Sequence, residues 1–484
     1  MPWRYRLPMV LACCLVVPVA WGATGASYRT VEIAGGGSVR VEAGVLRVPE
    51  SRAHATRRRI GIPWYRLAST AEHPAAPIFM LAGGPGASGL DELQSAEVYR
   101  EVAFYRSMAD VVLFDQRGAG HAKPLMRCPQ TARYPYDQPL DWARLRKTMR
   151  RMLAACRDHW QRQGVDLAAY DTVENAADVD DLRRALGYGK VTLVGGSYGS
   201  HLALQVMRRY PQAVDRAVLY GVEGPDQTWD DPDEVLAALR RYDEALQAQA
   251  HRLGLRVPEG GWLAALGRVE RRLGRQPVDV ALEHGGRTTH VVVDAGLVRL
   301  MALHRAGSHD DRHAWANMIL AMDHGDFSQA ARAAIDFRDL RLSRPMHYSM
   351  DCASGVDDAR RARYARSPAL GLIGDINLEY RMLCDLWPAR DLGPGYRATV
   401  VSSIPALLFQ GTWDVSTPLE NAHEVLAGLR RGQLVTVVGG NHGALYNLYD
   451  HWPPMHALMR GFLTGHDVKA PARVVMPWAE AVSP

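Results

Sequence analysis

The stretch VTLVGGSYGSHLAL, residues 191–204, is central to the fold, because an apolar run breaks on glycines around one serine and then resumes. Gly195, Ser197 and Gly199 match the pattern G-x-S-x-G, which marks a sharp turn between a strand and a helix. Only small residues let a chain turn that tightly, and the turn holds the serine hydroxyl clear of the backbone. The stretch therefore predicts a nucleophilic serine at the end of a buried strand.

Apolar segments around this stretch predict an α/β fold with a mostly parallel sheet flanked by helices. Short continuous apolar runs that end in glycine-rich turns are typical of strands buried on both faces. Two earlier segments alternate between apolar and polar residues, as antiparallel strands do. The expected strands are residues 39–51, 58–68, 77–84, 110–118, 190–196, 215–222, 404–414 and 433–443, and the expected helices are residues 171–186, 200–210 and 419–429.

Strand and helix alternate up to Val222, and the pattern then changes to helical spacing of apolar residues. We interpret this long stretch as a helical cap inserted into the sheet domain. The predicted organisation is a signal peptide (1–22), the first part of the core (27–225), the cap (226–395) and the second part of the core (396–470).

The N-terminus has the features of a secretory signal: two arginines, an apolar run over residues 7–20 and small residues near Gly22. The run is short for a membrane span, although a retained anchor is the alternative. We expect an exported protein, periplasmic or secreted, without stable membrane insertion after cleavage.

Four cysteines remain once the signal is removed, and an even number in an exported chain suggests two disulfides. Four cysteines allow three pairings. We favour the local pairs Cys128–Cys156 and Cys352–Cys384, with buried free thiols as the alternative.

Composition excludes some classes of partner. The chain has 484 residues, of which 47% are hydrophobic, so it can bury a large core. Its net charge of +5 is spread along the chain without a basic stripe, so we expect no nucleic-acid partner. The sequence leaves the oligomeric state undetermined.

A serine hydroxyl needs a base within reach and a carboxylate that orients the base. His442 lies in GGNHG just beyond the last predicted strand, and Asp414 directly follows the strand before it. The order serine, acid, histidine is that of α/β hydrolases. A helix-capping role is the alternative for Asp414, and Asp385 and Asp391 are the reserve candidates for the acid.

The oxyanion of an acyl-transfer reaction needs two backbone donors. We assign one to the N–H of Tyr198, which follows the nucleophile, and the other to Gly84 or its neighbour in AGGPG, residues 82–86. No Gly-Lys-Ser/Thr follows this loop, which argues against a phosphate-binding loop.

The segment HDDRH, residues 309–313, places two histidines four residues apart, as in H-E-x-x-H metallopeptidases. Aspartate replaces the glutamate and no third ligand is evident, so we predict neither a metal site nor a cofactor.

Several motifs together carry a family resemblance. The motifs are GGPG (83–86), DQRGAG (115–120), GGSYG (195–199), DVSTP (414–418) and GGNHG (439–443). They resemble those of the prolyl aminopeptidase and tripeptidyl aminopeptidase family of serine α/β-hydrolases. The likeness extends from about Val45 to Leu463, and RPMHYSMDCASG (344–355) is similar to the cap of exported bacterial members. Ala82 stands where prolyl aminopeptidases usually have histidine, which weakens a strict preference for proline.

The resemblance implies an α/β-hydrolase fold and removal of residues from the free N-terminus of short peptides. It also implies that acidic residues receive the substrate's α-ammonium group. Glu223, Asp351 and Glu379 are the candidates, although helix capping or salt bridging would also explain each carboxylate. Two other functions stay open: an esterase or amidase acting on a small acyl substrate, and a catalytically silent binding protein on the same scaffold.

Overall fold

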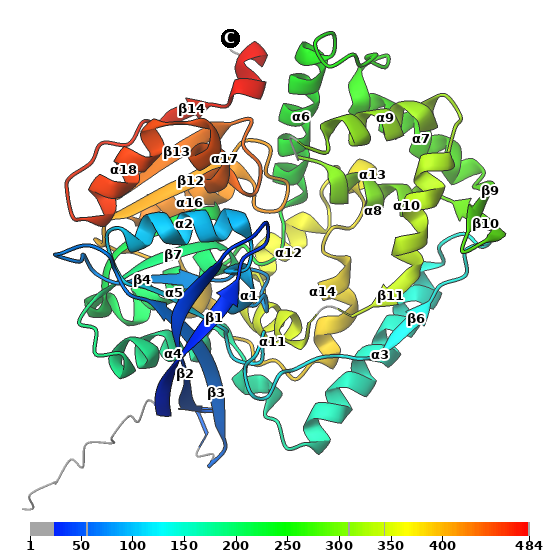
Figure 1. Ribbon diagram of the computed structural model, residues 1–484. Coiled ribbons are helices and arrows are strands. Elements are labelled where there is room, and N and C mark those ends of the chain that lie inside the picture. Colours follow the sequence, from blue (N-terminus) through cyan, green and yellow to red (C-terminus); the bar gives the residue numbers. More distant parts are fainter. Residues whose placement is uncertain (1–23, 55–56, 308–309, 343, 483–484) are drawn as a thin grey trace, which may run out of the picture.

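The computed structural model describes residues 24–54, 57–307, 310–342 and 344–482 (Figure 1). The predicted signal peptide lies outside these residues, as does His309 of the HDDRH segment. Within the described ranges, no helix has the length and apolarity needed to cross a membrane, and no group of three or more His, Cys, Asp or Glu side chains could hold a metal ion.

A ten-stranded sheet forms the centre of the molecule, with the strand order β1-β2-β3-β5-β4-β7-β8-β12-β13-β14. The first four strands in this order pair antiparallel, and β5, β4 and all later neighbours pair parallel. The strands of the sheet are β1 (Thr24–Glu32), β2 (Ser38–Pro49), β3 (Arg59–Leu67), β4 (Ile78–Leu81), β5 (Val111–Phe114), β7 (Val191–Ser197), β8 (Val214–Val222), β12 (Ala406–Gly411), β13 (Gly432–Val438) and β14 (Arg473–Val475). The predicted α/β fold is confirmed.

The central strands are continuously apolar because their successive side chains enter the hydrophobic cores on opposite faces of the sheet. Ile78 and Met80 of β4 pack into one hydrophobic core, whereas Phe79 and Leu81 pack into the core on the other face. Successive side chains of a strand point to opposite faces, so a strand covered on both faces needs apolar residues throughout. The helices of the sheet domain are α1 (Gly89–Glu92), α2 (Ala96–Arg106), α3 (Trp142–Arg162), α4 (Thr172–Ala185), α5 (Tyr198–Arg209), α16 (Leu419–Gly428), α17 (Ala444–His451) and α18 (Pro454–Leu463).

Residues 223–405 separate β8 from β12, and most of the described part of this segment lies to one side of the sheet in Figure 1. Helices fill most of this segment, but the antiparallel hairpin β9 (Val278–His284) and β10 (Arg287–Val293), which turns at Gly285 and Gly286, was missed by the sequence analysis. The helices are α6 (Pro232–Gln249), α7 (Gly261–Arg275), α8 (Ala295–Arg305), α9 (Arg312–Asp323), α10 (Ser328–Arg338), α11 (Pro345–Ser354), α12 (Asp358–Tyr364), α13 (Leu370–Ile373), α14 (Leu378–Leu383) and α15 (Pro394–Arg397).

Part of the chain before Ser197 packs against this inserted segment. The short strand β6 (Thr131–Arg133) pairs with β11 (Asp339–Arg341), and α3 contacts α14. These contacts join residues about 200 positions apart, which local sequence patterns do not reveal.

Two disulfides reinforce the same part of the molecule. Cys128 is bonded to Cys156 of α3, and Cys352 of α11 is bonded to Cys384. The favoured local pairing is confirmed, and disulfides are typical of proteins that fold in an oxidising compartment.

Candidate active site

Ser197 occupies the strand-to-helix turn predicted for it, as the last residue of β7 and the residue before α5. Its φ of 55° and ψ of −132° lie in a region that side chains rarely adopt. It is the one described residue other than glycine with a positive φ. Strain of this kind at a candidate nucleophile is kept only where the surrounding structure enforces it.

Glycines enforce that turn by excluding side chains. A Cβ atom on Gly199 would lie 2.0 Å from the carbonyl oxygen of Leu81, and one on Gly195 would lie 2.4 Å from the carbonyl oxygen of Gly199. A Cβ on Gly196 would lie 2.2 Å from the ring of Tyr220. Backbone and ring atoms cannot yield by that much, so the three glycines are required by packing.

Asp414 and His442 meet at the same end of the sheet, on the loops that follow β12 and β13. Nδ1 of His442 lies 3.0 Å from Oδ2 and 3.1 Å from Oδ1 of Asp414. Asp414 is completely buried, whereas the His442 side chain is 40% exposed. The Asp414 carboxylate can therefore hold the His442 imidazole, while the part of the ring that faces away from Asp414 stays accessible.

Hydrogen bonds hold the Asp414 carboxylate in its charged form. The backbone N–H groups of Ser416 and Thr417 donate to Oδ1, each at 2.9 Å, and the Thr417 hydroxyl and the Gln410 amide donate to Oδ2, each at 2.8 Å. Burial by itself would raise the pKa of Asp414, but His442 and these donors lower it below its ordinary value. Gln410 also accepts a hydrogen bond from Val222 N–H, so it ties the Asp414 loop to β8.

The imidazole of His442 lies over β8, the strand next to Ser197. Ser197 is in register with Val222, and a Cβ on Gly221 would lie 2.9 Å from the His442 ring. Burial lowers the pKa of His442, but the charge of Asp414 and its hydrogen bond outweigh burial and raise it above its ordinary value. The fold therefore brings all three predicted triad residues to the same end of the sheet, at the end of β7 and after β12 and β13, with β8 between β7 and β12.

The two segments assigned to the oxyanion also adjoin Ser197. A Cβ on Gly83 would lie 3.3 Å from Cβ of Ser197, so the glycine loop that continues into Gly84 passes directly beside the serine. The Tyr198 side chain is buried, and its hydroxyl lies 3.0 Å from Thr172 Oγ1 and 3.3 Å from Asn175 Nδ2. These contacts fix the side chain of the residue that directly follows Ser197.

Glu223 follows β8 directly and is nearly buried, with 12% of its side chain exposed. Burial and the negative charges of Asp351 and Asp230 raise its pKa well above the ordinary value. Nδ1 of His201 lies 3.3 Å from Glu223, but burial lowers the pKa of His201 to about 4, so this histidine is neutral at pH 7. His201 therefore supplies no compensating charge.

Asp230 is one of the negative charges that act on Glu223, and the sequence did not single it out. Burial and the charges of Asp414 and Asp351 raise its pKa to about 8. It also acts on the pKa of His442, so its carboxylate lies within electrostatic reach of the candidate base. Its place in the run DQTWDD, next to the helix-capping Asp231, gave no sequence signal that set it apart.

The two cap candidates differ in their surroundings. Asp351 lies 2.9 Å from Nδ1 of His347 and accepts a hydrogen bond from Tyr380 at 3.0 Å. Burial opposes ionisation of His347, but the charge of Asp351 prevails and raises the pKa of this histidine to about 9. Glu379 accepts a hydrogen bond from Tyr348 at 2.7 Å and, like Asp351, acts on His347.

The two reserve candidates for the triad acid lie apart from the site. Asp385 pairs with Arg150 at 2.6 Å, and Asp391 pairs with Arg397 at 2.6 Å. Both aspartate side chains are largely exposed, at 60% and 70%. They serve as surface ion pairs that join cap segments to neighbouring elements.

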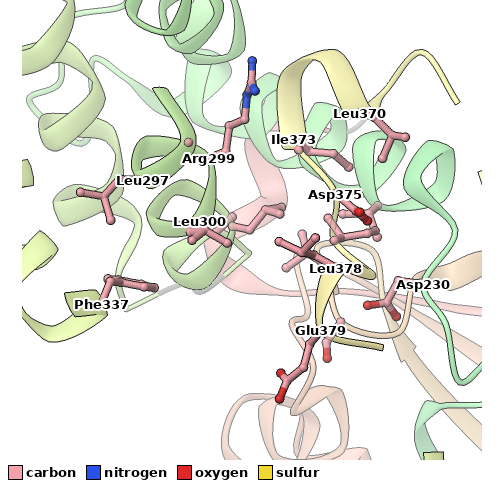
Figure 2. A pocket seen from close by; sticks show the side chains of 18 of the residues that line it. Asp230, Leu297, Arg299, Leu300, Phe337, Leu370, Ile373, Asp375, Leu378 and Glu379 are labelled. Carbon is pink, nitrogen blue, oxygen red and sulfur yellow. The ribbon is translucent and has the colours of Figure 1, made fainter. Parts of the chain in front are cut away.

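A cavity of about 1160 Å³ opens beside Asp414 and His442. Figure 2 shows Asp230 and Glu379 on one side of this cavity and Leu297, Leu300 and Phe337 on the opposite side. The site thus combines a serine, a histidine held by a carboxylate, a group of buried acids and an adjoining cavity.

Comparison with known families agrees with this geometry. Residues 76–252 match the model of the alpha/beta hydrolase fold, and residues 370–470 match the model of the TAP-like protein family. The chain has the α/β-hydrolase fold. The first match spans the Ser197 turn and the second spans Asp414 and His442.

Curated relatives of this α/β hydrolase carry peptidase names. A tripeptidyl aminopeptidase of Streptomyces lividans is 31% identical over 201 residues, which cover 39% of this chain and 37% of that protein. The serine protease Hip1 of Mycobacterium tuberculosis is 25% identical over 468 residues, covering 89% of this chain and 86% of that protein. A proline iminopeptidase of Neisseria meningitidis is 28% identical over 149 residues, covering 30% of this chain and 32% of that protein. The resemblance to the aminopeptidase-like α/β hydrolases is confirmed, while the match to the tripeptidyl aminopeptidase spans only about a third of its length.

Proposed function

We propose that this α/β hydrolase is an exported serine aminopeptidase that acts on short peptides with a free N-terminus. The observation that carries the proposal is the group of carboxylates formed by the buried Asp351 and the partly buried Glu223 and Asp230, beside the Asp414–His442 pair. Burial and mutual repulsion raise the pKa of Glu223 and of Asp230, so a cation bound among these groups would relieve a cost already present in the free protein. The α-ammonium group of a peptide is such a cation.

In the proposed reaction, Ser197 attacks the carbonyl carbon while His442 accepts its proton, and Asp414 orients and stabilises the imidazolium. The N–H groups of Tyr198 and of Gly84 or Gly83 receive the oxyanion. His442 then returns the proton to the leaving amine, and water releases the acyl group by the same steps in reverse. Because Asp414 raises the pKa of His442, activity should be lost as pH falls through a value above 6.5.

Binding of the ammonium group fixes the distance between the substrate's N-terminus and the scissile carbonyl. Ester or amide substrates without an amine would use the same triad but would gain nothing from the acidic group. Two disulfides and the leader-like N-terminus support placement outside the cytoplasm.

The test compares kcat/KM on arylamides of proline, alanine and Ala-Ala-Phe with that on their N-acetylated forms and on a short-chain phenyl ester. We expect acetylation to lower kcat/KM about 100-fold, because the buried carboxylates lose their cation. Ser197→Ala should abolish turnover of every substrate while leaving thermal unfolding unchanged. Equal rates on free and acetylated substrates, with fast ester cleavage, would instead establish an esterase, and full activity of Ser197→Ala would overturn the mechanism.

A further inference from the structure

The cavity beside His442 is larger than a single amino-acid side chain requires. Its volume of about 1160 Å³ is at the upper end for small-molecule sites, which run to roughly 1,000 Å³. Much of its wall is apolar and comes from α3, α8, α10, β11, α13 and α14, all of which lie far from Ser197 in the sequence. The inserted segment and α3 therefore build a second compartment next to the catalytic end of the sheet.

The position of His442 tells which part of a substrate enters this compartment. Among the described residues that line the cavity, Asn441, His442 and Gly443 are present and Ser197 is not. In serine hydrolases the histidine donates a proton to the leaving group, so the leaving group departs on the histidine's side of the serine. A cavity whose wall holds His442 without Ser197 thus lies on the leaving-group side.

The acidic group fits the same direction. Asp230 and Glu379 lie on one side of the cavity, with Leu297, Leu300 and Phe337 across from them (Figure 2), whereas Glu223 and Asp351 of the proposed amine site do not line it. A peptide held by its amine at Asp230, with its scissile bond at Ser197, would continue past His442 toward these apolar side chains.

The lining includes the charged residues Asp336 and Arg341, and three other charged residues of the lining are paired with protein groups. Arg299 pairs with Glu270 at 2.9 Å, Asp339 pairs with Arg133 at 2.8 Å, and Asp375 pairs with Arg381. What remains for a bound chain is mainly hydrocarbon from Leu300, Leu378 and their neighbours.

We propose that this cavity binds the leaving segment of the peptide, meaning the residues that follow the scissile bond, and that it selects apolar side chains there. The proposal rests on the proposed aminopeptidase function and adds the substrate class to it. No new covalent step is involved, because the cavity only positions the amine that His442 protonates.

The test uses peptide amides with one acyl segment, chosen from the best arylamide, followed by Leu-Leu or by Glu-Glu. We expect kcat/KM to be about 10-fold or more higher for the Leu-Leu peptide, because burial of leucine is favourable and burial of an unpaired carboxylate is not. The readout is the ratio of the two values, which does not depend on the fraction of active protein.

Variants of Leu300 locate the effect. Leu300→Lys should lower the Leu-Leu to Glu-Glu ratio about 10-fold, because the lysine attracts the Glu-Glu peptide and removes apolar contact from the Leu-Leu peptide. Leu300→Glu repels the Glu-Glu peptide as well, so it should lower kcat/KM on both peptides. Val401→Glu is the matched control, because Val401 is 65% exposed and does not line the cavity, and it should leave the ratio unchanged. Equal cleavage of the two peptides, or a Leu300→Lys variant that retains the wild-type ratio, would overturn the proposal. Absence of Ser197-dependent arylamide turnover would instead overturn the proposed function itself.

Discussion

Two aspartates of the candidate active site, Asp414 and Asp230, lie within electrostatic reach of each other, yet their pKa values move in opposite directions. Four hydrogen-bond donors and His442 surround Asp414 and lower its pKa. Asp230 has burial and two negative neighbours, Asp414 and Asp351, which raise its pKa to about 8. Hydrogen-bond donors placed by the fold, and not the residue type, therefore decide whether such a carboxylate stays ionised by itself or ionises readily only when a cation binds beside it.

Asp414→Asn should have the largest effect on catalysis of the substitutions at these two aspartates. The asparagine NH2 would present a donor where a carboxylate oxygen accepts the Nδ1–H, so His442 would adopt the wrong tautomer and kcat should fall about 10⁴-fold on amide and ester substrates alike. Steady-state kinetics on an arylamide and a phenyl ester measure this. Asp215→Asn, at a surface aspartate paired with Arg216, is the control and should retain full activity. A kcat close to that of the wild type would show that Asp414 does not orient the base.

Asp230→Asn should have a smaller and selective effect. Loss of one carboxylate from the ammonium site should lower kcat/KM about 10- to 100-fold on arylamides with a free amine, and much less on the phenyl ester. The ratio of the two substrates is the measurement. Asp231→Asn makes the same change one residue further on, where asparagine can still cap α6, and it should preserve the ratio. An equal loss on both substrates would assign Asp230 to the triad's support instead of to the amine.

Thermal stability should separate the two aspartates with opposite signs. The raised pKa of Asp230 means that its ionisation destabilises the folded protein as pH rises from about 4 to about 8. Asp230→Asn should therefore raise the Tm by roughly 2 °C at pH 8 and leave it unchanged at pH 4. The contribution of Asp414 is present above its ordinary pKa, so Asp414→Asn should lower the Tm at pH 8. Thermal melts across this range test both, and shifts of the same sign would contradict the comparison.

Several parts of the site could be predicted because they depend on local sequence. The turn at Gly195, Ser197 and Gly199 could be predicted from residue size, since any Cβ at the two glycines would collide with backbone atoms. Asp414 and His442 could be found because each follows an apolar strand, and parallel strands bring their ends to one edge of the sheet. The cysteine pairs could be chosen by proximity along the chain.

Other parts could not be predicted because they depend on contacts between distant segments. The raised pKa of Asp230 depends on the nearby charges of Asp351 and Asp414. The role of Gln410 depends on its amide reaching both Asp414 and Val222. The cavity requires α3 to pack against α14, and the pairing of β6 with β11 fixes that approach.

The α/β architecture, the nucleophile turn and the residues offered as base and acid could be predicted, because strand periodicity, glycine size and position after a strand are local properties. The carboxylates that repel each other beside His442, and the apolar compartment, follow only from the packing of distant segments. Electrostatic interaction and cavity shape depend on distances between side chains, and those distances are set when the inserted helices pack against the sheet.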